Sequence, residues 1–451
     1  MPPDYSGQNL QGRSFKGQNL EGTDFSYADI RSADFTGANL IGANFSHAKA
    51  GLQRRRAIFL VIVSLLLSGL SGSMLGIAGY IGAQGLNSFQ TSNQIASWSV
   101  IIAFVTFCLL AIRYGIQAGL GVLTGVGVVI GLLSVINFAP LIVITTAASI
   151  GIGSVAVASV GAVIIAIAGT FTLAGAIIGA VAGVIPGILI SGGVKVFTIT
   201  FTIAFTFPAV VVLLSFYISW QAIKGNKKYT IVRNVAIAFI AIGGTSYRKA
   251  NLTDANFTGT ILKSTDFREA TLTRTYWWNA RKLDLALPGT TYLQNVLVRQ
   301  LVITGDGKNK NYDRLDLQGL NLQEANLENS SLIDTDFYKA TLRKANLSRA
   351  ILVRAQMERA DLRGACLTGS CIQDWTISRE TKLDGIICDY VYLKWVDGDK
   401  RDQMPPRGKF KEGGFVTFVK YILDTVELYH EKDINPRLAL TVLQKMARDY
   451  D

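Results

Sequence analysis

The first fifty residues carry one apolar side chain at every fifth position, with small or polar residues between them. A period of five fits neither the 3.6-residue repeat of an α-helix nor the two-residue alternation of a strand. It requires a turn every five residues, and the Asn and Asp beside the apolar positions suit such turns. The pattern predicts a coil that stacks on itself, with these side chains pointing inward: Leu10, Phe15, Leu20, Phe25, Ile30, Phe35, Leu40 and Phe45.

The same rhythm returns in two blocks further along the chain, from Leu252 to Trp277 and from Leu317 to Ile372. These blocks predict N-terminal repeats over 1–50 and C-terminal repeats over 247–388, with an insertion at 278–314. From residue 340 to residue 365, the position two before each apolar centre is alanine: Ala340, Ala345, Ala350, Ala355, Ala360 and Ala365.

Segments such as Ala250-Asn251-Leu252 match the motif A(D/N)LXX, and on these residues the chain resembles the pentapeptide-repeat family. The resemblance implies a right-handed quadrilateral β-helix with four pentapeptides per coil. In that fold the central residue and the small residue two positions earlier point inward. The segments 47–55, 289–295, 299–307 and 381–393 also resemble a membrane-embedded pentapeptide-repeat type that is typical of cyanobacteria. The resemblance implies a form, and no agreed biochemical activity comes with it.

An apolar stretch separates the repeats, because residues 57–246 contain no Asp, Glu or His. Charges are costly inside a bilayer, so this composition predicts a multi-span α-helical membrane bundle of about six helices over 57–222. A basic junction at 51–56 precedes it, and a basic loop with an interfacial helix follows at 223–246. With six spans, one side of a plasma or thylakoid membrane receives both repeat segments, which are then cytoplasmic. The residues that give this topology are basic: Arg54, Arg55, Arg56, Arg113, Lys224, Lys227 and Lys228.

Glycines at four-residue spacing mark one helix face within the apolar stretch, at Gly175, Gly179, Gly183 and Gly187. Small residues let neighbouring helices approach closely, so this ridge predicts helix packing inside the bundle. A homo-oligomer built on the same ridge is the second interpretation, and a glycine-lined pore is the third. The pore is disfavoured for protons and cations because the stretch has no carboxylate or histidine to hold them.

Three aromatic residues, Tyr276, Trp277 and Trp278, end the first C-terminal block. Two interpretations stay open: the rings plug the end of a coil, or they form a contact patch for a partner protein. Within the insertion, Leu297–Ile303 reads as a strand and Gly305–Gly307 as a turn.

The tail, 389–451, predicts a linker followed by a small C-terminal helical hairpin. Residues 397–414 are polar, and apolar residues then recur at helical spacing from Phe415. Asn435 and Pro436 are typical of the start of a second helix. The hairpin either covers the open end of the β-helix or docks another protein.

Composition and chemistry narrow the function further. The four cysteines lack metal-site spacing and the chain has two histidines, so no metal site or cofactor is expected. No catalytic motif is present. Half of the net charge of +12 lies in the apolar stretch, which argues against a nucleic-acid partner. The sequence predicts a non-enzymatic integral membrane protein that presents a β-helix to a cytoplasmic partner protein, as a scaffold or assembly factor. The alternative is a Gly-rich channel or transporter.

Overall fold

The computed structural model describes residues 2–56, 226–241, 243–396 and 398–421, with shorter pieces at 58–59, 109, 112–113, 217–218, 220–222 and 224. The chain divides into two compact units. One unit joins Met1–Gly51 to Gly244–Asp451 and contains the five-residue repeats, and the other is Leu52–Gly243.

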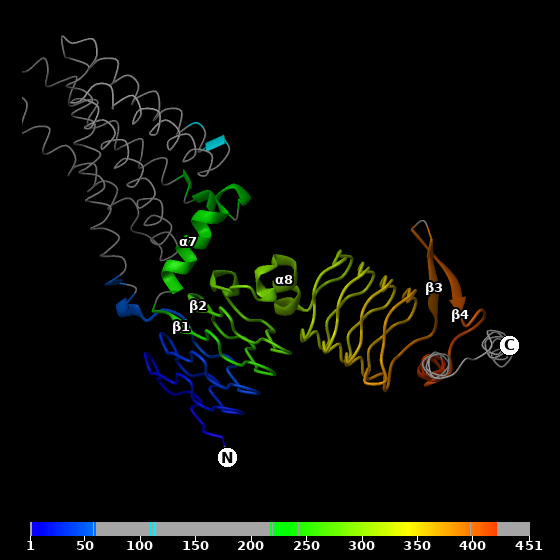
Figure 1. The fold of residues 1–451 in the computed structure, drawn as a ribbon, viewed down its shortest axis with the longest axis horizontal. Coiled ribbons are helices and arrows are strands. Elements are labelled where there is room, and N and C mark those ends of the chain that lie inside the picture. Colours follow the sequence, from blue (N-terminus) through cyan, green and yellow to red (C-terminus); the bar gives the residue numbers. More distant parts are fainter. Residues whose placement is uncertain are drawn as a thin grey trace, which may run out of the picture. The chain divides into compact units, whose positions relative to one another are not determined.

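The repeat unit begins with a column of square coils (Figure 1, blue to green). Each side of a coil forms a parallel β-bridge with the coil above it, and the step from Asp4 to Asp24 shows the usual 20-residue spacing. One of these contacts is long enough to form paired strands, β1 (Thr245–Ser246) and β2 (Thr265–Asp266). A 20-residue coil with five residues per side has four sides, as the resemblance to the pentapeptide-repeat family implies.

Aromatic side chains form two ladders inside this column, because phenylalanine occupies every second apolar centre and successive centres face different sides. On one side, Phe15, Phe35, Tyr247 and Phe267 stack with ring-centroid distances of 4.9, 5.2 and 5.1 Å. Rings of the facing ladder meet them edge to face, for example Phe25 against Phe35 at 5.4 Å. Aromatic pairs favour both arrangements, and each contributes about 0.5–1.5 kcal/mol beyond the burial of area.

The N-terminal block and the block after the apolar stretch are one continuous column. Asp34 bridges to Ser246 and Asn39 bridges to Asn251, so the returning chain takes the place of the next coil. The buried Thr245 hydroxyl closes this seam: it donates to the Ile30 carbonyl at 2.8 Å and accepts the Gly51 N–H at 2.8 Å. Unit Leu52–Gly243 is therefore an insertion into a β-helix that continues on both sides of it.

A short helical connection follows the first column, formed by η2 (Leu283–Leu285), η3 (Tyr292–Gln294) and α8 (Val296–Thr304). The prediction of a strand at Leu297–Ile303 is wrong. The Asn295 side chain accepts hydrogen bonds from the Leu297 and Val298 N–H groups, and Gly305 ends the helix in a left-handed conformation. These caps, with Val298 and Leu301 buried at the required spacing, make this apolar run a helix.

A second column of coils begins at Asp306 and continues to Tyr392 (Figure 1, yellow-green to orange). The turn prediction for Gly305–Gly307 needs correction, because Gly305 caps α8 and Gly307 occupies an inward centre. A Cβ on Gly307 would lie 2.9 Å from the Tyr312 hydroxyl and 3.1 Å from Leu301, so neighbouring side chains fill the space.

The column ends in a hairpin of β3 (Val391–Val396) and β4 (Asp399–Met404), which pair antiparallel. The polar segment predicted as a linker at 397–414 therefore contains a strand. The composition of this segment does not predict a strand, but its backbone pairs with β3 and so forms one. A helix at 414–421 follows, and its Phe415 and Phe418 are buried in the core with Phe410. Residues expected to form the second helix of the hairpin, from Asn435 onward, lie outside the described residues.

The inserted unit contributes η1 (Lys227–Tyr229) and α7 (Thr230–Ala241) to the described residues. The prediction of a multi-span membrane bundle, and with it of an integral membrane location, is wrong for this part of the chain: none of the described helices has the length and apolarity needed to cross a bilayer. Most of 57–222, where the spans were predicted, lies outside the described residues. The glycine ridge that motivated the pore also lies there.

Candidate protein-interaction surface

One side of the second column carries a cluster of cations that we call the basic face: Lys339, Arg343, Lys344, Arg359 and Arg363. The five-residue repeat places them there. Leu342 and Leu362 point inward and are fully buried, so the residues beside them point outward. Lys344 and Arg359 occupy corners, with left-handed φ values of 55° and 59°.

A single buried carboxylate lies among these cations. Asp361 is 8% exposed and accepts two hydrogen bonds from Arg363, at 2.9 and 2.8 Å. Arg343 reaches it from the preceding coil, and its Nε donates at 2.6 Å to Oδ2, the oxygen that also accepts from Arg363 Nη2. Burial opposes ionisation of Asp361, but the hydrogen bonds from Arg363 and Arg343 outweigh it and lower the pKa of Asp361 to about 2. Two guanidinium groups thus share one negative charge.

The remaining cations of the basic face add to this excess. Lys339 lies over the Tyr338 ring, with its ammonium 4.9 Å from the ring centroid. Arg359 donates to the Tyr338 hydroxyl at 3.1 Å and pairs with Glu380. Lys344 is exposed and makes no ion pair among the described residues. Five cations and three carboxylates, those of Asp361, Glu380 and Asp384, leave this face positively charged.

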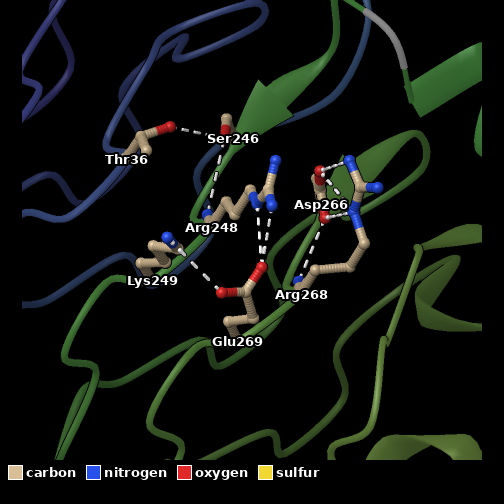
Figure 2. Close-up of polar contacts among 7 residues, drawn as sticks. All are labelled: Thr36, Ser246, Arg248, Lys249, Asp266, Arg268 and Glu269. Atoms are coloured by element: carbon tan, nitrogen blue, oxygen red, sulfur yellow. Dashed lines mark hydrogen bonds and ion pairs between the residues drawn. The ribbon is translucent and has the colours of Figure 1, made fainter.

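A second polar cluster, at the seam of the first column, has a different balance (Figure 2). Arg248 and Lys249 both pair with Glu269, at 2.8 and 3.6 Å. Arg268 forms a 2.7 Å ion pair with Asp266, whose side chain is mostly buried. The Ser246 hydroxyl lies 2.9 Å from that of Thr36, which ties the returning chain to the N-terminal block. Its charges are largely neutralised within the cluster, so we assign it a structural role at the seam.

The three aromatic residues predicted as a plug or a contact patch lie on the last coil of the first column. Trp277 is fully buried, stacks on Phe257 at 4.8 Å and donates its indole N–H to the Tyr292 hydroxyl at 2.8 Å. Tyr276 is half-buried, and burial raises its pKa. Trp278 is 36% exposed, with its ring against Gly305. Trp277 thus fills the core, while Tyr276 and Trp278 keep exposed surface, so a contact with a partner protein stays a prediction.

The other residues singled out in the sequence belong to the inserted unit or its junction. The glycines at 175, 179, 183 and 187 lie outside the described residues. The Lys228 ammonium donates to the Arg113 carbonyl at 2.7 Å, and Arg56 donates to the Gly243 carbonyl at 2.9 Å. Lys224 lies 5.0 Å from the Trp220 ring centroid. Arg54 and Arg55 are exposed on a helical turn, and Lys227 begins η1.

Sequence reasoning missed the basic face, although a local signal marks its centre. In three pentapeptides an Asp just before the apolar centre is followed by an Arg just after it. Each pair forms an ion pair on the outside of the coil: Asp29 with Arg31, Asp266 with Arg268, and Asp361 with Arg363. What distinguishes Asp361 is the second arginine, which comes from the neighbouring coil and so depends on the length of the coil.

A comparison with protein families agrees with the five-residue repeats. A family model described as "Pentapeptide repeats (8 copies)" matches residues 6–37, 19–50, 243–276, 313–349 and 342–374. These matched segments of the chain are pentapeptide repeats. The resemblance to the pentapeptide-repeat family is thereby confirmed, and the matched segment 243–276 begins where the chain returns from the inserted unit.

Solved pentapeptide-repeat structures are also similar to parts of the chain. One from the Arabidopsis thaliana thylakoid lumen is 25% identical over 20% of this chain and 66% of its own, with a TM-score of 0.19. One from the cyanobacterium Cyanothece is 17% identical over 22% of this chain and 97% of its own, with a TM-score of 0.14. HetL of the cyanobacterium Nostoc, described as involved in heterocyst differentiation regulation, is 13% identical over 88% of this chain and 94% of its own, with a TM-score of 0.16. The comparison with curated proteins found no match.

Proposed function

We propose that this pentapeptide-repeat protein is a non-catalytic scaffold whose basic face binds an acidic segment of a partner protein. The observation that carries the proposal is the charge balance around Asp361, where two arginines share one buried carboxylate.

The β-helix gives the basic face a fixed geometry. Its neighbouring coils are joined by bridges such as Thr341 with Asp361, and the backbone spacing between them is about 4.8 Å. A rigid array loses little conformational entropy on binding, which favours recognition of a flexible acidic segment. Each exposed ion pair contributes only about 0.2–1 kcal/mol, so several must form together and binding must weaken with salt.

The test is binding of a fluorescently labelled, Glu-rich peptide to the full-length protein in low and physiological salt. Lys339 and Lys344 are the residues to change, because neither is ion-paired with a carboxylate of the described chain. We expect the double substitution Lys339→Glu/Lys344→Glu to weaken binding about tenfold, which corresponds to about 1.4 kcal/mol.

The matched control changes two exposed residues of the first column, Lys16 and Lys49. Two such charge reversals, Lys16→Glu with Lys49→Glu, change the net charge equally at a different place. If both double variants weaken binding to the same degree, the peptide responds to net charge and the basic face is not the site. Tighter binding of a single-stranded RNA oligomer than of the peptide would also contradict a protein partner.

A further inference from the structure

An exposed pair of stacked aromatic rings, Tyr27 and His47, lies on one corner of the first column. Tyr27 occupies a corner position with φ 58°, where most other corners of the N-terminal block have glycine. A bulky residue in the left-handed region is uncommon, and its cost is about 1 kcal/mol or more. Tyr27 is also 66% exposed, so burial of its ring does not offset that cost. Other non-glycine residues, such as Ser32 and Lys249, occupy corners with the same left-handed φ, so what sets Tyr27 apart is its exposed ring.

The ring of Tyr27 has one covered face and one open face. Its covered face stacks on His47, the corner residue of the next coil, with centroids 5.0 Å apart and planes 16° from parallel. His47 in turn lies over Gly259, where a Cβ would be 2.6 Å from Nδ1. On the other side the preceding corner is Gly7, and a Cβ there would meet nothing within 4 Å. The stack therefore ends at Tyr27 beside an open space one coil high.

The charges near this open space favour a cation. Asp4 and Asp24 lie on the adjoining side of the same two coils, and neither forms an ion pair with another described residue. Asp24 accepts hydrogen bonds from the Ser26 N–H and from Asn44, and both donors are neutral. Arginine is the side chain that combines a positive charge with a planar group able to stack on an aromatic ring.

From this geometry we propose that the open face of Tyr27 binds an arginine side chain of a partner protein, as the next member of the Tyr27–His47 stack. The site is independent of the basic face, lies on the other column and selects the opposite charge. A scaffold with both sites holds two segments of different chemistry at fixed positions.

The test uses the full-length protein and two labelled peptides that differ only in carrying arginine or lysine between glycines. Arginine adds planar stacking to the cation–π attraction that lysine also supplies, so we expect the arginine peptide to bind about twofold more tightly than the lysine peptide. Tyr27→Gly should remove this preference while leaving the fold intact, because glycine favours the left-handed corner. Tyr27→Phe should keep the preference, because the ring remains.

Ser32→Gly is the matched control, since Ser32 is another left-handed corner (φ 59°) in the same coil, and its side chain is buried. It should leave the arginine preference unchanged. Equal binding of both peptides, no binding of either, or an equal loss in Ser32→Gly would each overturn the proposal. A dimer of the wild type that dissociates in Tyr27→Gly, without peptide binding, would assign the site to a second copy of the chain and also overturn it.

Discussion

Replacing Gly51 by alanine should open the seam at which the inserted unit joins the β-helix. Gly51 has φ 117°, which lies in the region that favours glycine, and a Cβ there would be 2.1 Å from the Lys263 carbonyl oxygen. That oxygen belongs to the backbone of the next coil, so the clash can be relieved only by moving the coil. The Gly51 N–H and carbonyl, which bond Thr245 and Ser32 at 2.8 and 2.7 Å, would be displaced with it.

The magnitude follows from these terms. The unfavourable backbone conformation costs about 1–2 kcal/mol, and each buried hydrogen-bonding group left without a partner costs about 1–3 kcal/mol. We therefore expect Gly51→Ala to destabilise the seam by about 4 kcal/mol. Gly37→Ala is the control, because Gly37 is also left-handed (φ 68°) but a Cβ there would meet nothing within 4 Å. Only the backbone term, about 1 kcal/mol, applies to it.

Hydrogen exchange measured by mass spectrometry on peptides that contain Ser32 and Thr245 reports the opening free energy at the seam. The expected difference of about 3 kcal/mol corresponds to roughly a hundredfold faster exchange in Gly51→Ala than in Gly37→Ala, since 1.4 kcal/mol is a factor of ten. Equal protection in the two variants would show that the seam accommodates a Cβ and that the steric reasoning fails.

Three further predictions concern the core and the carboxylate of the basic face. Tyr247→Phe should stabilise the protein by about 1 kcal/mol in thermal or denaturant unfolding, because the buried Tyr247 hydroxyl has no partner among the described residues; destabilisation would reveal one. Trp277→Ala should destabilise the first column by about 3–5 kcal/mol, and a loss below 1 kcal/mol would show that its plug is dispensable. The lowered pKa of Asp361 contributes stability that is present above its unfolded pKa of about 4 and is lost as pH falls towards about 2. Asp361→Asn should therefore flatten the pH dependence of unfolding in that window, and an unchanged profile would contradict the assignment.

The sequence predicts the interior of the repeats well, since every predicted centre from Leu10 to Phe45 is at most 3% exposed. It fails where a segment depends on partners distant in the chain. The strand β4 has a polar sequence, and its pairing with β3 determines its conformation. The helix α8 has a strand-like composition, and its caps at Asn295 and Gly305 decide the outcome. For the basic face, the local Asp361–Arg363 pair is readable in the sequence, while the approach of Arg343 requires the coil length.

The positions of the apolar centres do not predict on which side of the coil the chain returns after the inserted unit. Apolar centres fall on multiples of five up to Phe45 and two positions later from Leu252 onward, which fixes the length of the insertion only to within a multiple of five. Any of the four sides of the coil would satisfy that constraint. The structure selects one side: without Leu52–Gly243, Ser246 would follow Asp34 by the same 20-residue step that joins Asp4 to Asp24. Both ends of the inserted unit are consequently joined to the β-helix at a single corner. The Thr245 hydroxyl holds that corner together through its hydrogen bonds with Gly51 and Ile30.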